Sequence, residues 1–527
     1  MKQTFRYIHI CMLFMALVCQ NTVAQNPEDG CYSPMVGGLS YDVSAQTSVS
    51  DGRTPLWLNA NKYGLSSLEK TNGYLRVNVE RNLQADSVRR WGLGYGVDVA
   101  VPYHYTSKVV VQQAYAELRW LRGTLSVGSK QRPMQLKNNE LSSGSQALGI
   151  NARPVPQARL SLNDYWTLPF ANGWLHLKGH LAYGKMTDDN WQHDFTQRQT
   201  KYSDGLYYHS KAGYLKIGND DRFCPWSLEL GVEMAAQFGG TSYQVPMGDQ
   251  LVTVENGNGL KSFVNAFVPH GGEVGEGIYH NAEGNHLGSW MFRLNYDNDE
   301  WALSLYGEHF FEDHSSMFQV GKDGYTAGTD NWDQRKKGHF MVYKLKDMML
   351  GAEMRLRWGY WVRHVLFEYL FTKDQCGPVY HDHTYHVSNQ IAGNDNYYNH
   401  YIYTGWQHWG QVMGNPLYRS PLYNSDGRIE VENNRFRAFH VGVSGNPIEG
   451  LHYRLLATLQ DGWGSYENPF TEQRHNVSVL AEASWHFTRG KLRDWKVTGS
   501  YGMDSGSILG HNQGFQLTIS KSGILAK

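Results

Sequence analysis

The feature that most constrains the fold of this chain is a long, regular alternation of apolar and polar side chains. The segment 226–238, WSLELGVEMAAQF, sets Trp226 and Leu230 on one side of an extended chain and Glu229 and Glu233 on the other. A period of two is the signature of a β-strand whose two faces meet different surroundings. The same alternation recurs at residues 74–80, 175–181, 350–358, 477–487, 495–501 and 515–519. The sequence therefore predicts an all-β protein.

The length of these segments distinguishes a membrane barrel from a soluble sheet. They run to about 9 to 12 residues, which suits a tilted strand that crosses a bilayer better than the shorter strands of soluble sheets. Their apolar faces often start or end in Trp, Tyr or Phe, as amphipathic rings do at the headgroup level. Backbone groups must be paired in hydrocarbon, so such strands cross a membrane only as a closed cylinder. A soluble β-sandwich or propeller is the alternative.

Chain length and composition fit one large barrel. The chain has 527 residues, and dividing the mature length by the strand spacing gives about 16 to 20 strands. We expect short turns such as 297–300 on the periplasmic side and the longest loops, 243–286 and 372–434, outside. A net charge of −1 offers no basic surface for nucleic acid. Three cysteines beyond the first 24 residues are too few for a fold held together by disulfides.

The first residues have the pattern of an export signal. Lys2 and Arg6 precede an apolar run at about residues 8–18, and a small residue, Ala24, suits cleavage. The run is shorter than the roughly 20 residues that a membrane-spanning helix needs. We therefore expect Sec-type export. The expected domains are a signal peptide at 1–24, a periplasmic or lumen-associated segment at 25–72 with a short helix near 65–71, and a barrel at 73–527.

No catalytic signature stands out in the sequence. It lacks a G-x-S-x-G nucleophile elbow and a phosphate-binding G-x-x-x-x-G-K-[ST] loop. A lipid or glycan hydrolase would need a Ser or Asp beside a histidine such as His309 or His314. In HDHTYH, His381, His383 and His386 could hold a metal, but we interpret them as solvated loop residues because no second cluster completes a ligand set. We expect neither an enzyme nor a cofactor.

The richest candidate binding surface is the segment 394–418, NDNYYNHYIYTGWQHWGQVMGNPLY. Aromatic rings stack on the apolar faces of pyranoses, and interleaved Asn, Gln and His side chains reach sugar hydroxyls. The equal alternative is that these rings pack loops or mark the membrane interface. The candidate polysaccharide-binding residues are Tyr397, Tyr398, Tyr401, Tyr403, Trp406 and Trp409.

Several stretches resemble the Wzi family of capsule assembly proteins. They are LWLNANKYGLSSLEKTNGYLR at 56–76, QQAYAELRW followed by GSK between 112 and 130, and NNELSSGSQALGINARPVPQARLSL at 138–162. The Ser-Ser-Gly and Asn-Ala-Arg-Pro runs are the most specific part, and with MGNPL at 413–417 the resemblance covers nearly the whole mature chain. The motif residues are Ser142, Ser143, Gly144, Asn151, Ala152, Arg153 and Pro154.

The resemblance implies an outer-membrane β-barrel of about 18 strands in a Gram-negative bacterium, with its lumen occluded by loops or short helices. It implies a surface lectin that binds capsular polysaccharide and assists capsule assembly, neither an export pore nor an enzyme. The expected partners are polysaccharide and outer-membrane lipid, and the barrel is expected to be a monomer. A porin-like channel for solutes or saccharides is the alternative, favoured by the charged inward faces.

Within the motif, Arg153 precedes a Pro-x-Pro segment. Proline cannot donate to a ladder of backbone hydrogen bonds, so this stretch suits an edge, a bulge or an inward excursion better than the middle of a strand. We therefore interpret Arg153 as a fixed structural point near the barrel wall or lumen. A direct sugar contact is the alternative that this argument disfavours.

Overall fold

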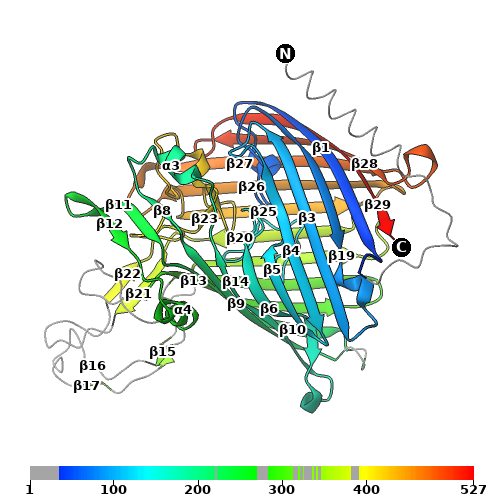
Figure 1. Ribbon diagram of the computed structural model, residues 1–527, viewed down its shortest axis with the longest axis horizontal. Helices are drawn as coiled ribbons and strands as arrows, with labels where there is room; N and C mark the ends of the chain where they lie inside the picture. The colour runs from blue at the N-terminus through cyan, green and yellow to red at the C-terminus, as the bar shows by residue number, and fades with distance from the viewer. Residues whose placement is uncertain are drawn as a thin grey trace.

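The computed structural model is a closed barrel of 18 antiparallel strands (Figure 1). It describes residues 35–219, 222, 224–269, 283–312, 319–320, 324–325, 335–336, 340–341, 346–380 and 391–526. The wall strands are β1 Leu39–Asp51, β2 Thr71–Arg81, β3 Trp91–Tyr103, β4 Val110–Trp120, β5 Gly123–Ser129, β6 Gln157–Thr167, β7 Leu175–Lys185, β9 Tyr207–Ile217, β10 Trp226–Phe238, β13 Asn285–Asp297, β14 Trp301–Glu312, β19 Met348–Leu356, β20 His364–Phe371, β25 Phe436–Gly445, β26 Leu451–Gly464, β27 Pro469–His486, β28 Trp495–Gly506 and β29 Asn512–Ala526.

Pairing between the first and last strands closes the cylinder. β1 pairs with β2 on one side and with β29 on the other. Each further wall strand pairs antiparallel with the next one along the chain, so the described wall has no free edge. Closure pairs the backbone groups inside the wall, as a sheet in hydrocarbon requires. The predicted all-β barrel and its strand number of 18 are confirmed.

Shorter elements occupy the connections. The helices are α2 Leu56–Asn59, α3 Trp191–Thr196 and α4 Leu260–Phe267. The short strands are β8 Tyr202–Asp204, β11 Thr241–Met247, β12 Gln250–Glu255, β15 Gln319–Val320, β16 Gly324–Tyr325, β17 Arg335–Lys336, β18 Phe340–Met341, β21 Cys376–Tyr380, β22 Ile391–Asn394, β23 Gln407–His408 and β24 Gln411–Val412. Across the described ranges, no helix is long and apolar enough to cross a membrane.

The register of β10 against β13 shows which face of the wall meets which solvent. Leu230 pairs with Phe292, and Glu229 pairs with Arg293. Leu230 is 41% exposed on the outer surface, whereas Glu233 is 1% exposed on the lumen side. The wall thus turns its apolar face outward, as a barrel in lipid does. Other outward apolar side chains of the wall are Val97, Val101, Leu118, Leu125, Leu160, Leu294, Leu305, Phe367, Phe439, Leu455, Val477 and Phe515.

Aromatic side chains cluster where the strands meet their short turns. The rings of Trp91 and Trp120 stack with centroids 6.0 Å apart. The ring of Tyr296 lies 4.8 Å from Trp226 and 5.0 Å from Trp301. Amphipathic rings are favoured at the boundary between hydrocarbon and water. The aromatic girdle expected from the sequence is therefore present at this end of the wall.

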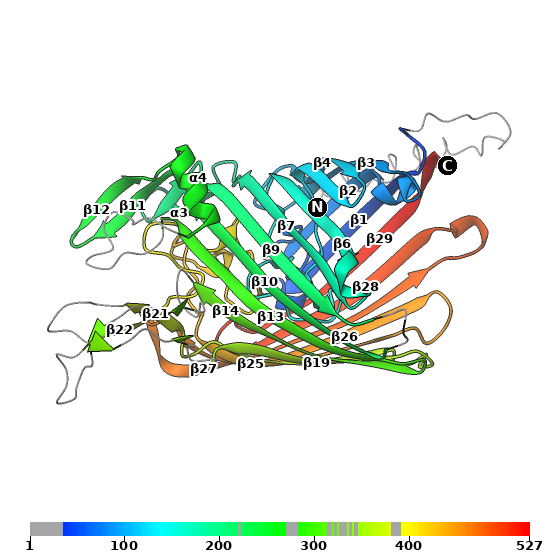
Figure 2. The ribbon, with the colours of Figure 1, turned by 90° about the horizontal axis from the view of Figure 1, so that it is seen from below.

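The two ends of the barrel differ in their connections. The turn end carries short connections, such as residues 298–300 between β13 and β14. The last strand, β29, also ends there. The loop end carries the longer connections, including residues 239–284 and 372–435. Figure 2 shows β11 and β12 projecting beyond the loop end, on the side opposite to the C-terminus.

The structure differs from the sequence expectations near the ends of the chain. The wall begins with β1 at Leu39 and not at residue 73, because β1 is a full partner of β2 and β29. The described residues 65–71 contain no helix, and a helical turn lies at α2 instead. β29 continues through residues 520–526, beyond the alternating segment at 515–519. The expected signal peptide lies outside the described residues.

The hydrophobic core of the molecule lies inside the barrel. Residues 130–156, here called the first insert, connect β5 to β6, and residues 395–435, here called the second insert, lead from β22 to β25. One cluster of buried apolar side chains joins both inserts and α2 to inward side chains of wall strands from β9 to β27. The inserts therefore pack against the wall from within, and they occlude the lumen.

Candidate functional site

A buried carboxylate on the wall holds the Ser-Ser-Gly run of the first insert. Glu368 of β20 is 0% exposed, and it accepts hydrogen bonds from Ser142 Oγ at 2.6 Å and from the Ser143 amide at 2.8 Å. Ser143 Oγ and Tyr306 Oη donate the other two bonds, each at 2.5 Å. A carboxylate without water needs several donors to offset its desolvation. The serines supply these donors, so this contact fixes the insert to the wall.

The rest of the motif ties the two inserts together. Gly144 has a φ of +140°, and a Cβ there would lie 2.9 Å from Pro416 of the second insert, so this close approach requires glycine. Asn151 Nδ2 donates to the carbonyl oxygen of Val412 at 3.0 Å. The carbonyl oxygen of Pro154 accepts a hydrogen bond of 3.0 Å from Ser129 Oγ at the end of β5. Ala152 belongs to the shared buried cluster.

Arg153 connects the first insert to a wall loop and to the second insert. Its guanidinium donates to Ser107 Oγ at 2.9 Å and to Thr106 Oγ1 at 3.2 Å, and it lies 4.0 Å from the ring centroid of Trp409. Its carbonyl oxygen accepts a hydrogen bond from His408 Nδ1 at 2.8 Å. Burial lowers the pKa of Arg153 to about 10. The side chain is thus engaged with protein groups on three segments.

Four of the six candidate sugar-binding rings are sealed within the second insert. Tyr397, Tyr398, Tyr403 and Trp406 are each 0% exposed. Trp406 Nε1 donates to the carbonyl oxygen of Ala147 in the first insert at 2.9 Å. A ring without an exposed face cannot stack on a pyranose in this arrangement. These four side chains match the packing alternative that the sequence left open.

The other two candidates differ from these four. Trp409 is half-buried, with Arg153 over its ring. Tyr401 is 41% exposed at the loop end. Tyr401 is therefore the candidate whose ring is available to a ligand that arrives from the loop end.

A large open cavity, here called the mouth groove, surrounds Tyr401. Its volume is about 1050 Å³, near the upper end of the roughly 300–1,000 Å³ of typical ligand sites. Its walls come from the second insert, β11, β12 and the connection from β26 to β27. The amide side chains on its lining are Gln199, Gln244, Asn396, Asn399 and Asn468, and the aromatic rings that it leaves accessible are those of Tyr401 and Phe470.

Charged side chains on the described lining of the mouth groove are mostly acidic. The six carboxylates are Glu312, Asp395, Asp426, Glu430, Glu432 and Glu467, and the three cations are Lys201, Arg428 and Arg474. Lys201 Nζ donates to the carbonyl oxygen of Tyr401 at 3.2 Å, and burial lowers the pKa of Lys201 to about 8. Arg474 lies 3.9 Å from the ring centroid of Phe470. The groove thus combines ring faces and amides with an excess of negative charge.

Histidines suggested as partners in a hydrolase or metal site do not form one in the described part of the chain. His309 Nδ1 lies 2.6 Å from the carbonyl oxygen of Asp347, so this ring bonds to backbone. The described residues hold no group of three or more His, Cys, Asp and Glu side chains that could bind a metal. Residues outside the described ranges include His314, His381, His383 and His386.

Sequence reasoning missed the wall residues that hold the inserts. Besides Glu368, Glu308 of β14 pairs with Lys137 of the first insert at 2.8 Å. Glu308 also accepts a bond from Ser145 Oγ at 3.0 Å. Both carboxylates occupy polar positions of alternating strands, so the sequence could indicate their lumen side. It could not indicate their partners in the first insert, which lie more than a hundred residues away.

One solved structure with a similar fold is an outer-membrane barrel. The Escherichia coli outer-membrane protein Wzi, described as a carbohydrate-binding β-barrel involved in group 1 capsule assembly, superposes with a TM-score of 0.52 at 14% identity, over 94% of this chain and 86% of Wzi. The likeness shows that this chain has the same kind of barrel fold as Wzi. At this identity the likeness shows the fold and not the activity.

Two further solved structures align over the same length. Pseudomonas aeruginosa OccK5 (OpdH) matches with a TM-score of 0.44 at 9% identity, over 92% of this chain and 98% of its own. Pseudomonas aeruginosa OccK2 (OpdF) in complex with glucuronate matches with a TM-score of 0.44 at 8% identity, over 92% of this chain and 98% of its own. No protein-family model and no curated protein matches the sequence.

Proposed function

We propose that this protein binds capsular or related surface polysaccharide and assists capsule assembly or attachment without chemical conversion of the polymer. The observation that carries the proposal is the mouth groove, about 1050 Å³ in volume, above a lumen that the inserts occlude. The fold likeness to Wzi, described as a carbohydrate-binding barrel, supports it. In this proposal residues 1–24 direct export, the barrel is a monomer in lipid, and the loop end faces outward.

The chemistry of the mouth groove suits sugars. Tyr401 and Phe470 offer ring faces for the apolar sides of pyranoses. Asn396 and Asn468 place amide groups on the same lining, and amides can both donate to and accept from hydroxyls. The excess of carboxylates repels a densely acidic polymer. We therefore infer that the preferred saccharide is neutral or carries amino groups.

A solute channel on the same barrel is the alternative function. Charged inward side chains favour it, such as Arg293, which pairs with Glu353 at 2.8 Å on the lumen side of the wall. Transport would require the inserts to leave the lumen. That movement would break the three hydrogen bonds that Ser142 and Ser143 donate to Glu368, and it would expose the buried apolar cluster, so these contacts favour a closed barrel.

Binding of capsular polysaccharide to the full-length protein in nanodiscs tests the proposal. Tyr401→Ala is expected to weaken binding by about tenfold, because it removes the exposed ring of the mouth groove. Tyr360→Ala is the matched control, since Tyr360 is 75% exposed but lies at the turn end. Trp406→Ala is expected to lower stability, because its ring is sealed.

Two results would contradict this proposal at different levels. Equal binding by the parent protein and Tyr401→Ala would rule out the mouth groove as the site. A parent protein that binds no polysaccharide, together with normal cell-attached capsule in a deletion strain, would rule out the function itself.

A further inference from the structure

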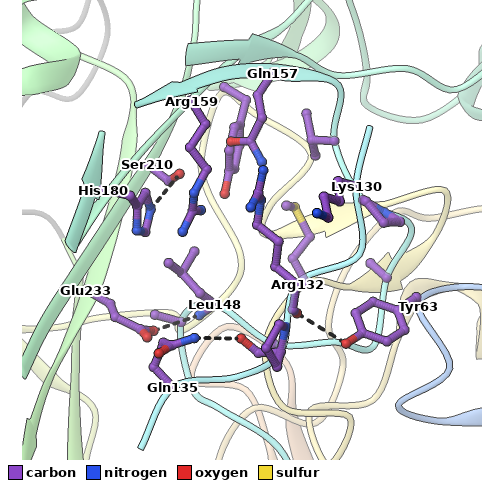
Figure 3. A pocket seen from close by; sticks show the side chains of 18 of the residues that line it. Tyr63, Lys130, Arg132, Gln135, Leu148, Gln157, Arg159, His180, Ser210 and Glu233 are labelled. Atoms are coloured by element: carbon purple, nitrogen blue, oxygen red, sulfur yellow. Dashed lines mark hydrogen bonds between the residues drawn. The ribbon is translucent and has the colours of Figure 1, made fainter. Parts of the chain in front are cut away.

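A second, smaller cavity lies inside the barrel, between the first insert and the wall. Its volume is about 100 Å³. The wall contributes residues of β6, β7, β9 and β10, and the inserts contribute the opposite side. Figure 3 shows that Arg132, Arg159 and His180 extend into the same space. We call this space the lumen cavity.

Positive charge predominates on the lining of the lumen cavity. Its cations are Lys130, Arg132, Arg153 and Arg159, and its carboxylate is Glu233. Glu233 is already engaged, because it accepts bonds from Tyr214 Oη at 2.6 Å and from the Leu148 amide at 3.3 Å. The lining therefore carries more cationic groups than its own acid can neutralise.

Three of these cations have partners of their own. Lys130 Nζ lies 2.5 Å from a carboxylate oxygen of Glu117, and Arg132 lies 3.6 Å from the other oxygen. Arg132 also donates to Ser126 Oγ at 2.8 Å. The guanidinium of Arg153 donates to two hydroxyls of a wall loop. Their charges are thus at least partly compensated within the protein.

Arg159 differs from these three cations. Its guanidinium makes no hydrogen bond or ion pair with any residue that the structure describes, and its Nε, like those of Arg132 and Arg153, is buried without an acceptor. Arg132 adds to the positive charge around it, and both guanidinium groups act electrostatically on His180. Arg159 is half-buried, and a partly desolvated guanidinium without an acceptor is costly, so a partner that brings oxygen acceptors and negative charge would be favoured there.

We propose that the lumen cavity is a binding site for a small oxyanion, a phosphate or carboxylate group held by Arg159 together with Arg132. The planar guanidinium presents paired donors that match the oxygens of such groups. A dry cavity of about 150 Å³ holds a benzene ring, so about 100 Å³ suits a group smaller than a sugar ring. The ligand is a free anion or the acidic substituent of a larger molecule that reaches in. This site does not depend on the mouth groove.

Calorimetric titration of the purified full-length barrel, at constant ionic strength, tests the site with three probes. Inorganic phosphate and acetate stand for free anions, and glucuronate carries the carboxylate on a sugar. We expect at least one of them to bind and to raise the unfolding temperature. Binding of phosphate or acetate indicates a free anion as ligand, and binding of glucuronate alone indicates a saccharide carboxylate.

Arg159→Gln is expected to weaken the binding of that probe by at least about tenfold, because a charge-assisted pair of hydrogen bonds is lost. In anion-free buffer the same variant should unfold at the parent temperature or above it, since it removes a half-buried charge that has no ion-pair partner among the described residues. Arg293→Gln is the control: Arg293 already pairs with Glu353 outside the lumen cavity, so this variant should keep anion binding and lose stability.

Three results would overturn the proposal. The first is a parent protein that binds none of the three probes. The second is equally tight binding of the probe by Arg159→Gln and by the parent. The third is an unfolding temperature of Arg159→Gln well below that of the parent in anion-free buffer, which would make Arg159 a structural residue. Tyr401→Ala should bind the probe normally, so failure here is distinguishable from failure of the mouth groove.

Discussion

At the scale of single residues, Glu368 is a buried polar contact between the wall and the first insert. Its two carboxylate oxygens accept four hydrogen bonds from Ser142, Ser143 and Tyr306 in a site that water does not reach. A hydrogen bond to a buried charge contributes about 1.5–3 kcal/mol. The contact therefore stabilises both the barrel and the closed position of the insert.

Glu368→Gln should lower the free energy of unfolding by about 2–3 kcal/mol, because the amide keeps the shape but loses the charge and one acceptor. Amide hydrogen exchange at residues 142–144 should become faster. Urea unfolding and mass spectrometry measure both effects. Glu449→Gln is the matched control, because Glu449 is exposed and lies 4.0 Å from Arg489. Unchanged exchange in Glu368→Gln would contradict the role of this contact.

His408 of β23 makes the stability of the second insert depend on pH. Its Nδ1 donates to the carbonyl oxygen of Arg153 at 2.8 Å, and its Nε2 accepts from the Thr187 amide at 3.2 Å, so the bonds require a neutral ring. Burial lowers the pKa of His408 from 6.5 to about 4. Between these values the unfolded chain binds the proton and the folded chain does not, so the folded state loses stability as the pH falls.

We therefore expect His408→Gln to reduce the loss of stability between pH 6.5 and pH 4. The contribution of the parent histidine over this range is at most about 3 kcal/mol. Thermal unfolding of the parent and the variant at a series of pH values measures the difference. Parallel curves for the two proteins would show that His408 does not titrate in this way.

At the scale of elements, β10 shows what alternation can reveal. The period of two in residues 226–238 predicts both faces of this strand, and the structure places Leu230 outward and Glu233 inward. β1 escaped the same reasoning, because outward residues such as Ala45 and Thr47 contrast weakly with its inward Ser44 and Gln46. Local pattern thus predicts a strand only where its two faces differ strongly.

Leu230→Arg tests the outward assignment of β10. Leu230 lies near the middle of the strand and pairs with Phe292 and Leu215 on the neighbouring strands. An arginine at the bilayer midplane should cost about 2–4 kcal/mol of folding free energy in lipid vesicles. Leu230→Ala removes the same side chain without adding charge. An equal cost for the two variants would show that Leu230 is not in hydrocarbon.

The inserts show where local pattern fails. The sequence singled out the aromatic side chains of 394–418, but composition alone cannot tell a ring on a surface from a ring in a core. Tyr398 is sealed for two reasons. Its ring stacks on Tyr418 with centroids 3.9 Å apart, and its hydroxyl donates a hydrogen bond to the carbonyl oxygen of Gln146 in the first insert. Gln146 is distant in the chain and the contact with Tyr418 depends on the folded loop, so only the folded structure separates Tyr401 from its neighbours.

At the scale of the whole molecule, the barrel reverses the usual arrangement of a soluble protein. Lipid-facing side chains are apolar, and the apolar core lies in the lumen, where the inserts meet α2 and the wall. The family resemblance and the strand length were sufficient to predict a barrel of about 18 strands with an occluded lumen. They were not sufficient to locate the mouth groove or the lumen cavity, since both depend on contacts between segments far apart in the chain.

The electrical conductance of the purified protein in a planar lipid bilayer tests the central claim most directly, namely that the barrel is a closed binding protein. The inserts fill the lumen and are held by Glu368, Glu308 and the shared apolar core. We expect inserted barrels to show no steady channel current at moderate voltage. Stable, reproducible open-channel steps would contradict the account and favour a solute channel.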